Sequence, residues 1–288
     1  MNNIILVAGG AGFIGINFVE YWSQNYKNDN IIVFDNLTYS SNKIFLSELI
    51  KKNKNIKFEK GNILNKKKII TLLKKYKINK IINFAAETHV DNSILDPKIF
   101  IDTNILGTFI LLDAARKVWE KNKVKNTHFH QISTDEVYGS LKKNQKKFKE
   151  ESKFNPSSPY SASKASSDLL VMSFFKTYQM NVTISNTSNN FGPFINQEKL
   201  IPKIILNIIN NKKIPIYGNG NQIREWIFVL DHIKGIEKIL FKGKFGESYN
   251  LSSNFNISNV KLVKLICKII NDKFFNNNKY LKQYPKAI

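Results

Sequence analysis

Two short stretches carry residues whose types and spacing could do acid–base chemistry. In the first, Asp135 and Glu136 directly follow an apolar run typical of a strand, and in the second Tyr160 precedes Lys164 by four residues. Side chains four residues apart share one face of a helix. An ammonium one turn from a phenol favours the phenolate, so we expect Tyr160 to titrate closer to neutral and to act as a base. A base that takes a hydroxyl proton could assist the oxidation of a carbinol, and an acid and a second base could then assist the elimination of water.

The N-terminal residues combine a buried strand with a glycine-rich turn. Residues 4–8 form a continuous apolar run, which suits a strand buried on both faces of a parallel sheet. The segment 9–15 follows directly, with glycines at Gly9, Gly12 and Gly15, before an apolar pattern of helical period. Glycines there allow a tight turn and close approach of the backbone to a pyrophosphate, which the free N–H groups at the helix start can bind. The segment therefore predicts a dinucleotide site.

An acidic residue refines the choice of dinucleotide. A second apolar strand at 31–34 ends at Asp35, 20 residues after Gly15. At that distance an acid hydrogen-bonds the adenosine ribose hydroxyls and disfavours a 2′-phosphate, so we expect NAD rather than NADP. Taken alone, the Tyr-x-x-x-Lys spacing is common at surfaces and an acidic pair is common in solvated turns. The order of strand, glycines, helix, strand and acid makes an NAD-dependent enzyme the favoured interpretation.

Apolar runs and helical periods alternate along the chain, which predicts an α/β fold. We expect a doubly wound parallel sheet, a Rossmann-type NAD domain, at 1–186. Beyond it the pattern changes to short strands, Gly/Asn turns and two helices, which predicts a smaller α/β substrate-binding domain at 187–288. Strands are predicted at 4–8, 31–34, 56–59, 80–83, 127–132 and 182–186, and helices at 13–25, 42–52, 65–76, 97–118, 160–179, 198–210 and 231–241.

Composition narrows the class of protein. Apolar residues make up 42% of the 288 residues, as in a globular protein, and the formal charge is +22. The lysines are dispersed with Asn and Ile along the chain and no nucleic-acid-reading motif is present, so we expect no nucleic-acid partner. The single Cys267 suits a reducing compartment. Without a basic flank before the first strand or an apolar run of membrane-spanning length, we expect a cytoplasmic protein with no signal peptide and no membrane partner. No metal site is expected.

Together these residues resemble the extended short-chain dehydrogenase/reductase family, and within it the nucleotide-sugar dehydratases. The most specific element is Thr134-Asp135-Glu136, because related epimerases and decarboxylases usually lack the acidic pair. The resemblance implies that the chain returns to the main sheet after residue 226, so that the two domains interleave. Further matching segments are 85–91, 103–104, 188–193, 198–202, 217–220, 224–226 and 231–232.

The resemblance implies a role for each catalytic candidate. Tyr160, helped by Lys164, would remove the 4-hydroxyl proton of dTDP-glucose while C4 gives a hydride to NAD. Glu136 would take the C5 proton, and Asp135 would protonate the departing C6 hydroxyl before hydride returns to C6. Thr134 would hydrogen-bond near the 4-hydroxyl. The implied product is dTDP-4-dehydro-6-deoxyglucose, made for deoxysugar biosynthesis of the dTDP-rhamnose type.

The resemblance also implies the binding residues and the assembly. A homodimer is expected through the helices at 97–118 and 160–179. The nucleotide sugar would be held by Thr88, Thr134, Asn189, Lys199, Leu200, Pro215, Tyr217, Arg224 and Asn259. NAD would be held by Gly9, Gly12, Phe13, Ile14, Gly15, Asp35, Asn62, Ile63, Ala85, Ala86, Thr103, Tyr160, Lys164 and Asn190.

The chain departs from the family pattern at several positions. Asn62 stands where an Asp usually contacts the adenine amino group, Asn186 where many members carry Arg, and Phe191 where Tyr is usual. The chain also ends several dozen residues before the family's usual end, without an Arg-Pro-Gly-His-Asp type segment that closes on the nucleotide. We therefore expect near-normal NAD binding with weaker binding of dTDP-glucose. Two alternatives stay open: another NAD-dependent nucleotide-sugar epimerase or decarboxylase, and an inactive shortened remnant.

Overall fold

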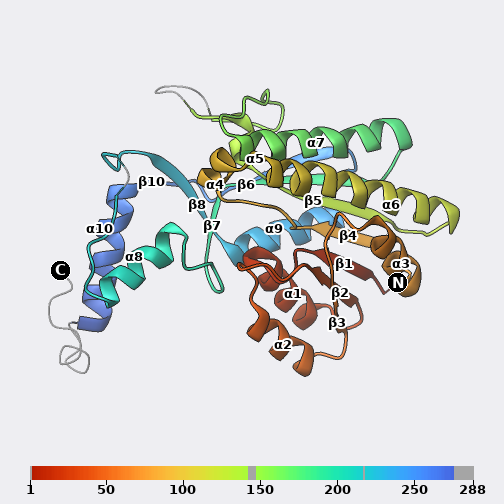
Figure 1. Cartoon of the computed structure of the whole chain (residues 1–288), viewed down its shortest axis with the longest axis horizontal. Helices are drawn as coiled ribbons and strands as arrows, with labels where there is room; N and C mark the ends of the chain where they lie inside the picture. The colour runs from red at the N-terminus through yellow and green to blue at the C-terminus, as the bar shows by residue number, and fades with distance from the viewer. Residues whose placement is uncertain (1, 142–146, 217, 276–288) are drawn as a thin grey trace.

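The computed structural model describes residues 2–141, 147–216 and 218–275. In that part of the chain, seven parallel strands form one sheet in the order β3-β2-β1-β4-β5-β6-β9 (Figure 1). Its inner strands β5 and β6 are buried along their whole length, as expected for a parallel sheet covered on both faces. The strands are β1 (Ile4–Ala8), β2 (Asn30–Asp35), β3 (Ile56–Lys60), β4 (Lys80–Asn83), β5 (His128–Thr134), β6 (Val182–Thr187) and β9 (Glu247–Leu251).

Helices cover both faces of this sheet, and each face has its own core. Alternate residues of β1 divide between them, because Leu6 and Ala8 pack into one core while Ile5 and Val7 pack into the other. The first core is closed by α3 (Lys66–Tyr76), α6 (Thr108–Lys121) and α7 (Pro159–Tyr178). The second is closed by α1 (Phe13–Asn25), α2 (Lys43–Lys52) and α9 (Val229–Lys242). The fold is the doubly wound Rossmann-type α/β sheet that the alternating pattern predicts.

The strand order reverses between β1 and β4, and this positions the site. From β1 the chain winds to one side through β2 and β3, and from β4 to the other side through β5 and β6. At such a switch point the connections leaving the carboxyl ends of the strands diverge and leave a crevice for a ligand. The turn after β1, the segment 84–89 after β4 and the segment 135–138 after β5 all leave the sheet at this edge.

A smaller group of elements extends from the end of the main sheet. β7 (Asn189–Phe191), β8 (Ile223–Phe228) and β10 (Phe255–Ser258) form a second sheet in the order β10-β8-β7. Helices α8 (Leu200–Ile209) and α10 (Asn259–Ile270) lie side by side and share a small apolar core (Figure 1). A short π-helix, η3 (Asn271–Phe275), follows α10. Between these elements α9 and β9 return to the main sheet, where β9 pairs with β6.

The predicted helix at 97–118 is divided in the structure. It consists of α5 (Pro97–Phe100), the π-helix η1 (Ile101–Gly107) and α6, and it is preceded by the unpredicted α4 (Val90–Leu95). Asn104 in η1 accepts a hydrogen bond from the Glu87 N–H at 2.9 Å and donates to Ser163 Oγ at 2.8 Å. These tertiary bonds hold the wider turn in place, and single-turn π segments of this kind often occur at functional sites.

Candidate active site

The turn between β1 and α1 has a conformation that requires glycine. Gly9 has a φ of +72°, and a Cβ on it would lie 2.5 Å from the Ala85 nitrogen. A Cβ on Gly15 would lie 2.3 Å from the Gly9 carbonyl oxygen, which would separate the helix from the turn. The Gly12 N–H donates to the Gly9 carbonyl at 3.1 Å and closes the turn. The turn therefore presents backbone rather than side chains to a ligand, as phosphate binding requires.

The N-terminus of α1 is open to an anion. The helix begins at Phe13, and its N-cap residue Gly12 provides no side-chain hydrogen bond. The first turn carries no acidic residue. The N–H groups of Phe13 and Ile14 have no intrahelical partner at this position, and the helix dipole adds positive potential there. This arrangement fits a pyrophosphate.

Asp35, at the end of β2, lies at the edge of the same turn. One carboxylate oxygen accepts the Ala11 N–H at 3.0 Å, and the other accepts the Leu37 N–H at 2.8 Å and the Ser41 hydroxyl at 3.1 Å. A carboxylate has about four lone-pair positions, so these bonds leave capacity for a ribose hydroxyl. Ser41 orients this acid and was absent from the sequence-based set. Its position six residues after the acid gave no signal, since serine is common in such loops.

The segment after β3 carries the next two cofactor candidates. Asn62 Oδ1 accepts the Leu64 N–H at 2.9 Å, so the acceptor expected to meet the adenine already closes a local turn. Ile63 is buried and packs against Gly107, where an added Cβ would approach its side chain to 2.4 Å. Because Gly107 has no Cβ, η1 can pack closely on this segment.

The remaining cofactor candidates follow β4 and β6. Ala85 and Ala86 are half-buried directly after β4, and Thr103 is half-buried in η1. Asn190 in β7 is held at both ends of its amide. Its Nδ2 donates to Thr187 Oγ1 at 3.0 Å, and its Oδ1 lies 2.8 Å from Nδ1 of the buried His232.

The acidic pair lies in a one-turn 3-10 helix, η2 (Asp135–Tyr138), directly after β5. Thr134 is its N-cap, and its Oγ1 accepts the Glu136 N–H at 3.2 Å and donates to Asp135 Oδ1 at 3.4 Å. The Thr134 side chain also acts on Tyr160, where it opposes the rise in pKa that burial causes. The same residue therefore acts on the acidic pair and on the tyrosine, and neither carboxyl belongs to a solvated turn.

The two carboxyls lie in different electrostatic surroundings. Burial, together with Glu136 and Glu225, raises the pKa of Asp135 to about 7. Burial also raises the pKa of Glu136, but the positive charges of Arg224 and Lys199 oppose that rise. The surroundings therefore favour a proton on Asp135 and a negative charge on Glu136, which suits one acid and one base.

The raised pKa of Asp135 predicts a pH dependence of stability. Its pKa in the fold, about 7, is above the ordinary value of 3.8. The stability that protonated Asp135 contributes to the folded state is fully present below its ordinary pKa and is lost as pH rises through about 7. The unaltered protein should therefore lose stability between pH 5 and pH 8, whereas Asp135→Asn should not. The difference in free energy of unfolding between the two should shift in favour of Asp135→Asn by on the order of 1–3 kcal/mol. Urea unfolding at both pH values tests this, and equal differences at the two would contradict it.

Tyr160 and Lys164 share a face of α7, but the expected effect on Tyr160 was wrong. Both side chains are buried, and the Lys164 ammonium donates to the Ile132 carbonyl at 2.7 Å rather than to the phenol. Burial, followed by the charge of Glu136, raises the pKa of Tyr160 above its ordinary value. Burial also lowers the pKa of Lys164. Desolvation therefore outweighs the helical spacing, and a bound substrate or cofactor must contribute if Tyr160 is to lose its proton.

The predicted substrate residues fall into two groups. In the first group, Lys199 and Arg224 lie close enough to the acidic pair for their charges to act on Glu136. Asn189 belongs to the same group, because its Nδ2 donates to the carbonyl of Glu225, the residue after Arg224, at 3.1 Å. The others lie on surrounding segments. Thr88 and Pro215 are exposed, Leu200 begins α8, Asn259 begins α10, and Tyr217 lies outside the described residues.

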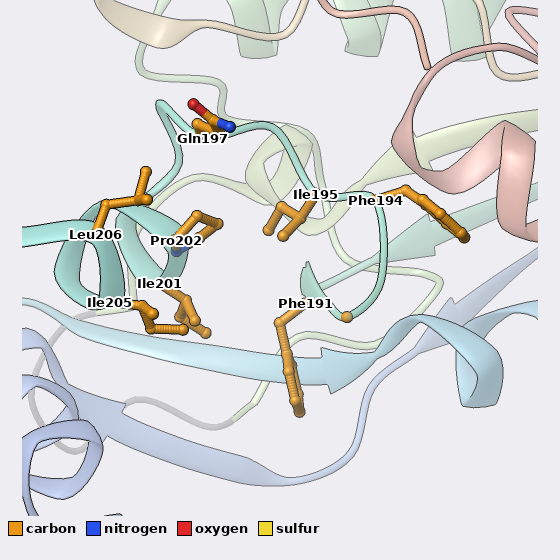
Figure 2. A pocket seen from close by; sticks show the side chains of 9 residues that line it. Phe191, Phe194, Ile195, Gln197, Ile201, Pro202, Ile205 and Leu206 are labelled. Atoms are coloured by element: carbon orange, nitrogen blue, oxygen red, sulfur yellow. The ribbon is translucent and has the colours of Figure 1, made fainter. Parts of the chain in front are cut away.

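An apolar pocket of about 400 Å³ adjoins the predicted substrate residues. Figure 2 shows side chains of α8, among them Ile201 and Ile205, on one side and Phe191 and Ile195 on the other. Its lining contains none of the catalytic candidates. Lys199 and Leu200 directly precede Ile201 in the chain, so the pocket adjoins two of the predicted substrate residues.

The described residues contain neither a membrane-spanning helix nor a cluster of metal ligands. No helix there is both long enough and apolar enough to cross a membrane. No group of three or more His, Cys, Asp or Glu side chains in the same residues could hold a metal ion.

The fold and site define a Rossmann-type enzyme of the short-chain dehydrogenase/reductase class. A family model described as GDP-mannose 4,6 dehydratase matches residues 6–285, and the chain belongs to that family. It is 42% identical over 283 residues to the dTDP-glucose 4,6-dehydratase of Haemophilus influenzae, covering 97% of this chain and 83% of that protein.

Solved structures agree with this assignment. The crystal structure of dTDP-glucose 4,6-dehydratase from Bacillus anthracis in complex with NAD has a TM-score of 0.84 and 42% identity, covering 93% of this chain and 81% of that one. The dTDP-glucose 4,6-dehydratase of Streptomyces venezuelae, with NAD and TYD bound, has a TM-score of 0.86 and 36% identity over the same shares.

Proposed function

We propose that the chain is an NAD-dependent dTDP-glucose 4,6-dehydratase, a hydro-lyase that forms dTDP-4-dehydro-6-deoxyglucose for deoxysugar biosynthesis. The observation that carries this proposal is the half-buried Asp135-Glu136 pair, which Thr134 holds by hydrogen bonds and whose charges act on Tyr160. Oxidation alone needs only the tyrosine and the lysine. An added acid and base, with opposite protonation preferences, are what the removal of water requires.

The residues at the switch point fit NAD. The glycine turn and the open start of α1 would hold the pyrophosphate, and Asp35 would accept from the ribose. When bound, NAD supplies a hydride acceptor that can return the hydride, so it is not consumed. Lys164, Thr103 and Asn190 would line the nicotinamide half, while Asn62, Ile63, Ala85 and Ala86 would line the adenosine half and the middle.

The chain's own side chains then move the protons. Tyr160 takes the proton of the 4-hydroxyl, and Thr134, which favours the ionised phenol, would help to stabilise the developing charge. Glu136 removes the C5 proton, which the new 4-ketone acidifies. Asp135 gives its proton to the C6 hydroxyl, which leaves as water, and Glu136 can later return its proton to C5. The hydride removed from C4 ends at C6, and the proton taken by Tyr160 must pass to Asp135 to restore both residues, so the net change is the loss of one water.

The substrate would be held mainly by its charges. Lys199 and Arg224 are cations whose charges act on Glu136, and a diphosphate between them would also reduce that effect. Residues 187–288 would act chiefly as the substrate-binding domain, with α9 and β9 interleaved into the NAD-binding domain of 1–186. We place the protein in the cytoplasm.

Product analysis on a panel of nucleotide sugars tests the function. The purified chain with NAD should convert dTDP-glucose to a 4-keto-6-deoxy product that is lighter by one water. An epimer of the same mass, or loss of carbon dioxide from a uronic-acid substrate, would favour an epimerase or decarboxylase instead. Binding of NAD without turnover of any sugar would favour the inactive remnant.

The cofactor preference should depend on Asp35. Asp35→Ala removes the ribose acceptor and its negative charge, so NAD affinity should fall and the discrimination against NADP should relax. The loss of one hydrogen bond to a charged group corresponds to about 1.5–3 kcal/mol, or roughly tenfold to a hundredfold in affinity. Calorimetric titration with each dinucleotide measures both effects. Tighter binding of NADP than of NAD by the unaltered chain would contradict the assignment.

We propose a homodimer through the surface formed by α4 to α7. Large apolar side chains remain exposed there, including Leu95, Phe109 and Leu169, and such patches usually mark interfaces. Leu169→Asp should produce a monomer in sedimentation experiments. Ile44→Asp is the control, because Ile44 is 80% exposed but lies on α2, which covers the other face of the main sheet. A micromolar solution of monomeric unaltered protein would contradict the proposal.

A further inference from the structure

Helix α7 carries a third buried ionisable side chain that the reaction above does not use. Tyr160, Lys164 and Asp168 follow one another at intervals of four residues, so they lie on one helix face. Their exposed fractions are 8%, 3% and 1%. A carboxyl this deep inside a protein is costly unless it is paired or has a function.

Neutral donors hold only one oxygen of Asp168. Its Oδ2 accepts the Ser133 hydroxyl at 2.5 Å and the Asn186 amide at 3.4 Å. Its Oδ1 is buried and has no hydrogen-bond partner among the described residues. The carboxyl is thus fixed in position, while one of its oxygens lacks the donor that a purely structural role would supply.

Lys164, in turn, is a buried cation that needs a nearby negative charge. Its ammonium is buried, donates to the Ile132 carbonyl, and belongs to no direct ion pair among the described residues. A buried cation needs an anion to stay charged. The carboxylate of Asp168 acts on Lys164 to raise its pKa, and the charge of Lys164 acts on Asp168 in return.

We propose that Asp168 is a positioning residue whose carboxylate keeps the buried Lys164 charged, and that the charged lysine assists proton loss from Tyr160. The inference rests on the proposed function for its kinetic consequence only. Burial raises the pKa of Asp168 to about 6, so the carboxylate is mostly ionised at neutral pH and can serve as the counter-ion.

Other ionisable groups face Tyr160, Lys164 and Asp168, and the same groups are present in the unaltered protein and in the variants. Asp135, Glu136 and Tyr138 approach from η2, and Tyr160 lies on α7 itself. The neighbouring strand β6 contributes the neutral Asn186. A change seen on substituting Asp168 alone is therefore assigned to Asp168.

The experiment measures the titration of Lys164 directly. In protein labelled with ¹⁵N-lysine, the Lys164 Nζ signal is assigned by its loss in Lys164→Met. Asp168→Asn should lower the pKa of Lys164 by about one pH unit or more. The alkaline limb of the pH profile for sugar oxidation should move to lower pH by the same amount, whereas Asp168→Glu should leave it near its original position.

Asp113→Asn is the matched control. Asp113 is a buried carboxyl on the neighbouring helix α6, but it pairs with Lys66, Lys117 and Arg116 and not with Lys164. This substitution should leave the Lys164 titration and the pH profile unchanged. A loss of stability in both variants with no movement of the Lys164 titration would overturn the proposal.

A second measurement on the unaltered protein covers the case in which Asp168→Asn does not fold. The Lys164 signal should show an inflection where Asp168 titrates, near pH 6. Absence of that inflection overturns the proposal. Because neither titration needs substrate, a chain that shows the coupling but makes no product would refute the proposed function and leave the role of Asp168 intact.

Discussion

Tyr160→Phe is expected to lower the rate of sugar oxidation by about 10²–10⁴-fold, the usual contribution of a positioned general base. Phe keeps the buried ring and its packing but removes the oxygen that accepts the 4-hydroxyl proton. Rapid mixing of the NAD-loaded variant with dTDP-glucose should show no rise of reduced-nicotinamide absorbance. The affinity for NAD, measured by calorimetry, should stay close to that of the unaltered chain.

Tyr138→Phe is the control for this experiment. Tyr138 is also a buried phenol beside the acidic pair, but its hydroxyl donates to Asn250 Oδ1 at 3.0 Å. Its loss should change stability more than oxidation. If the two variants oxidised the sugar equally fast, Tyr160 would not be the base.

Asp135→Asn is expected to separate elimination from oxidation. The amide cannot give a proton to the C6 hydroxyl, so loss of water should slow by about 10²–10⁴-fold while oxidation proceeds. Mass spectrometry of quenched mixtures should then detect a 4-keto sugar that retains its C6 oxygen. In the unaltered chain, elimination should slow as pH rises through about 7, because Asp135 loses its proton there.

The variant should lack that pH dependence. Asp113→Asn again serves as a control for the loss of a buried carboxylate, since its partners are Lys66, Lys117 and Arg116 rather than any group of the candidate site. Equal loss of oxidation and elimination in Asp135→Asn would remove Asp135 from the role of acid and leave it a structural part of η2.

Much of the main sheet could be predicted because its strands are local apolar runs between turn residues. β1 at Ile4–Ala8 and β4 at Lys80–Asn83 lie where the sequence predicts them, and α1 begins directly after the glycine turn. β9 carries Glu247, Ser248 and Asn250, so no apolar run marks it. Its place in the sheet depends on pairing with β6, a contact between distant segments that no local pattern encodes.

The candidate site likewise has residues that the sequence could predict and residues that it could not. The glycines and Asp35 act through local backbone geometry, which spacing reveals. The titration of Tyr160 depends on burial and on Glu136, neither of which follows from a four-residue interval, and the expected direction was therefore wrong. Asp168 was missed for a related reason, because a single Asp on a helix gives no sign that its carboxyl is enclosed beside Ser133 and Asn186.

The most direct test follows one hydrogen atom through the reaction. The purified chain is incubated with NAD and dTDP-glucose carrying deuterium at C4, and the product is examined by NMR and mass spectrometry. Our account predicts a 4-keto-6-deoxy sugar with the deuterium in the C6 methyl group, because the atom removed during oxidation returns after water has left. Deuterium retained at C4 of an epimer, or a dehydrated product without deuterium at C6, would contradict it.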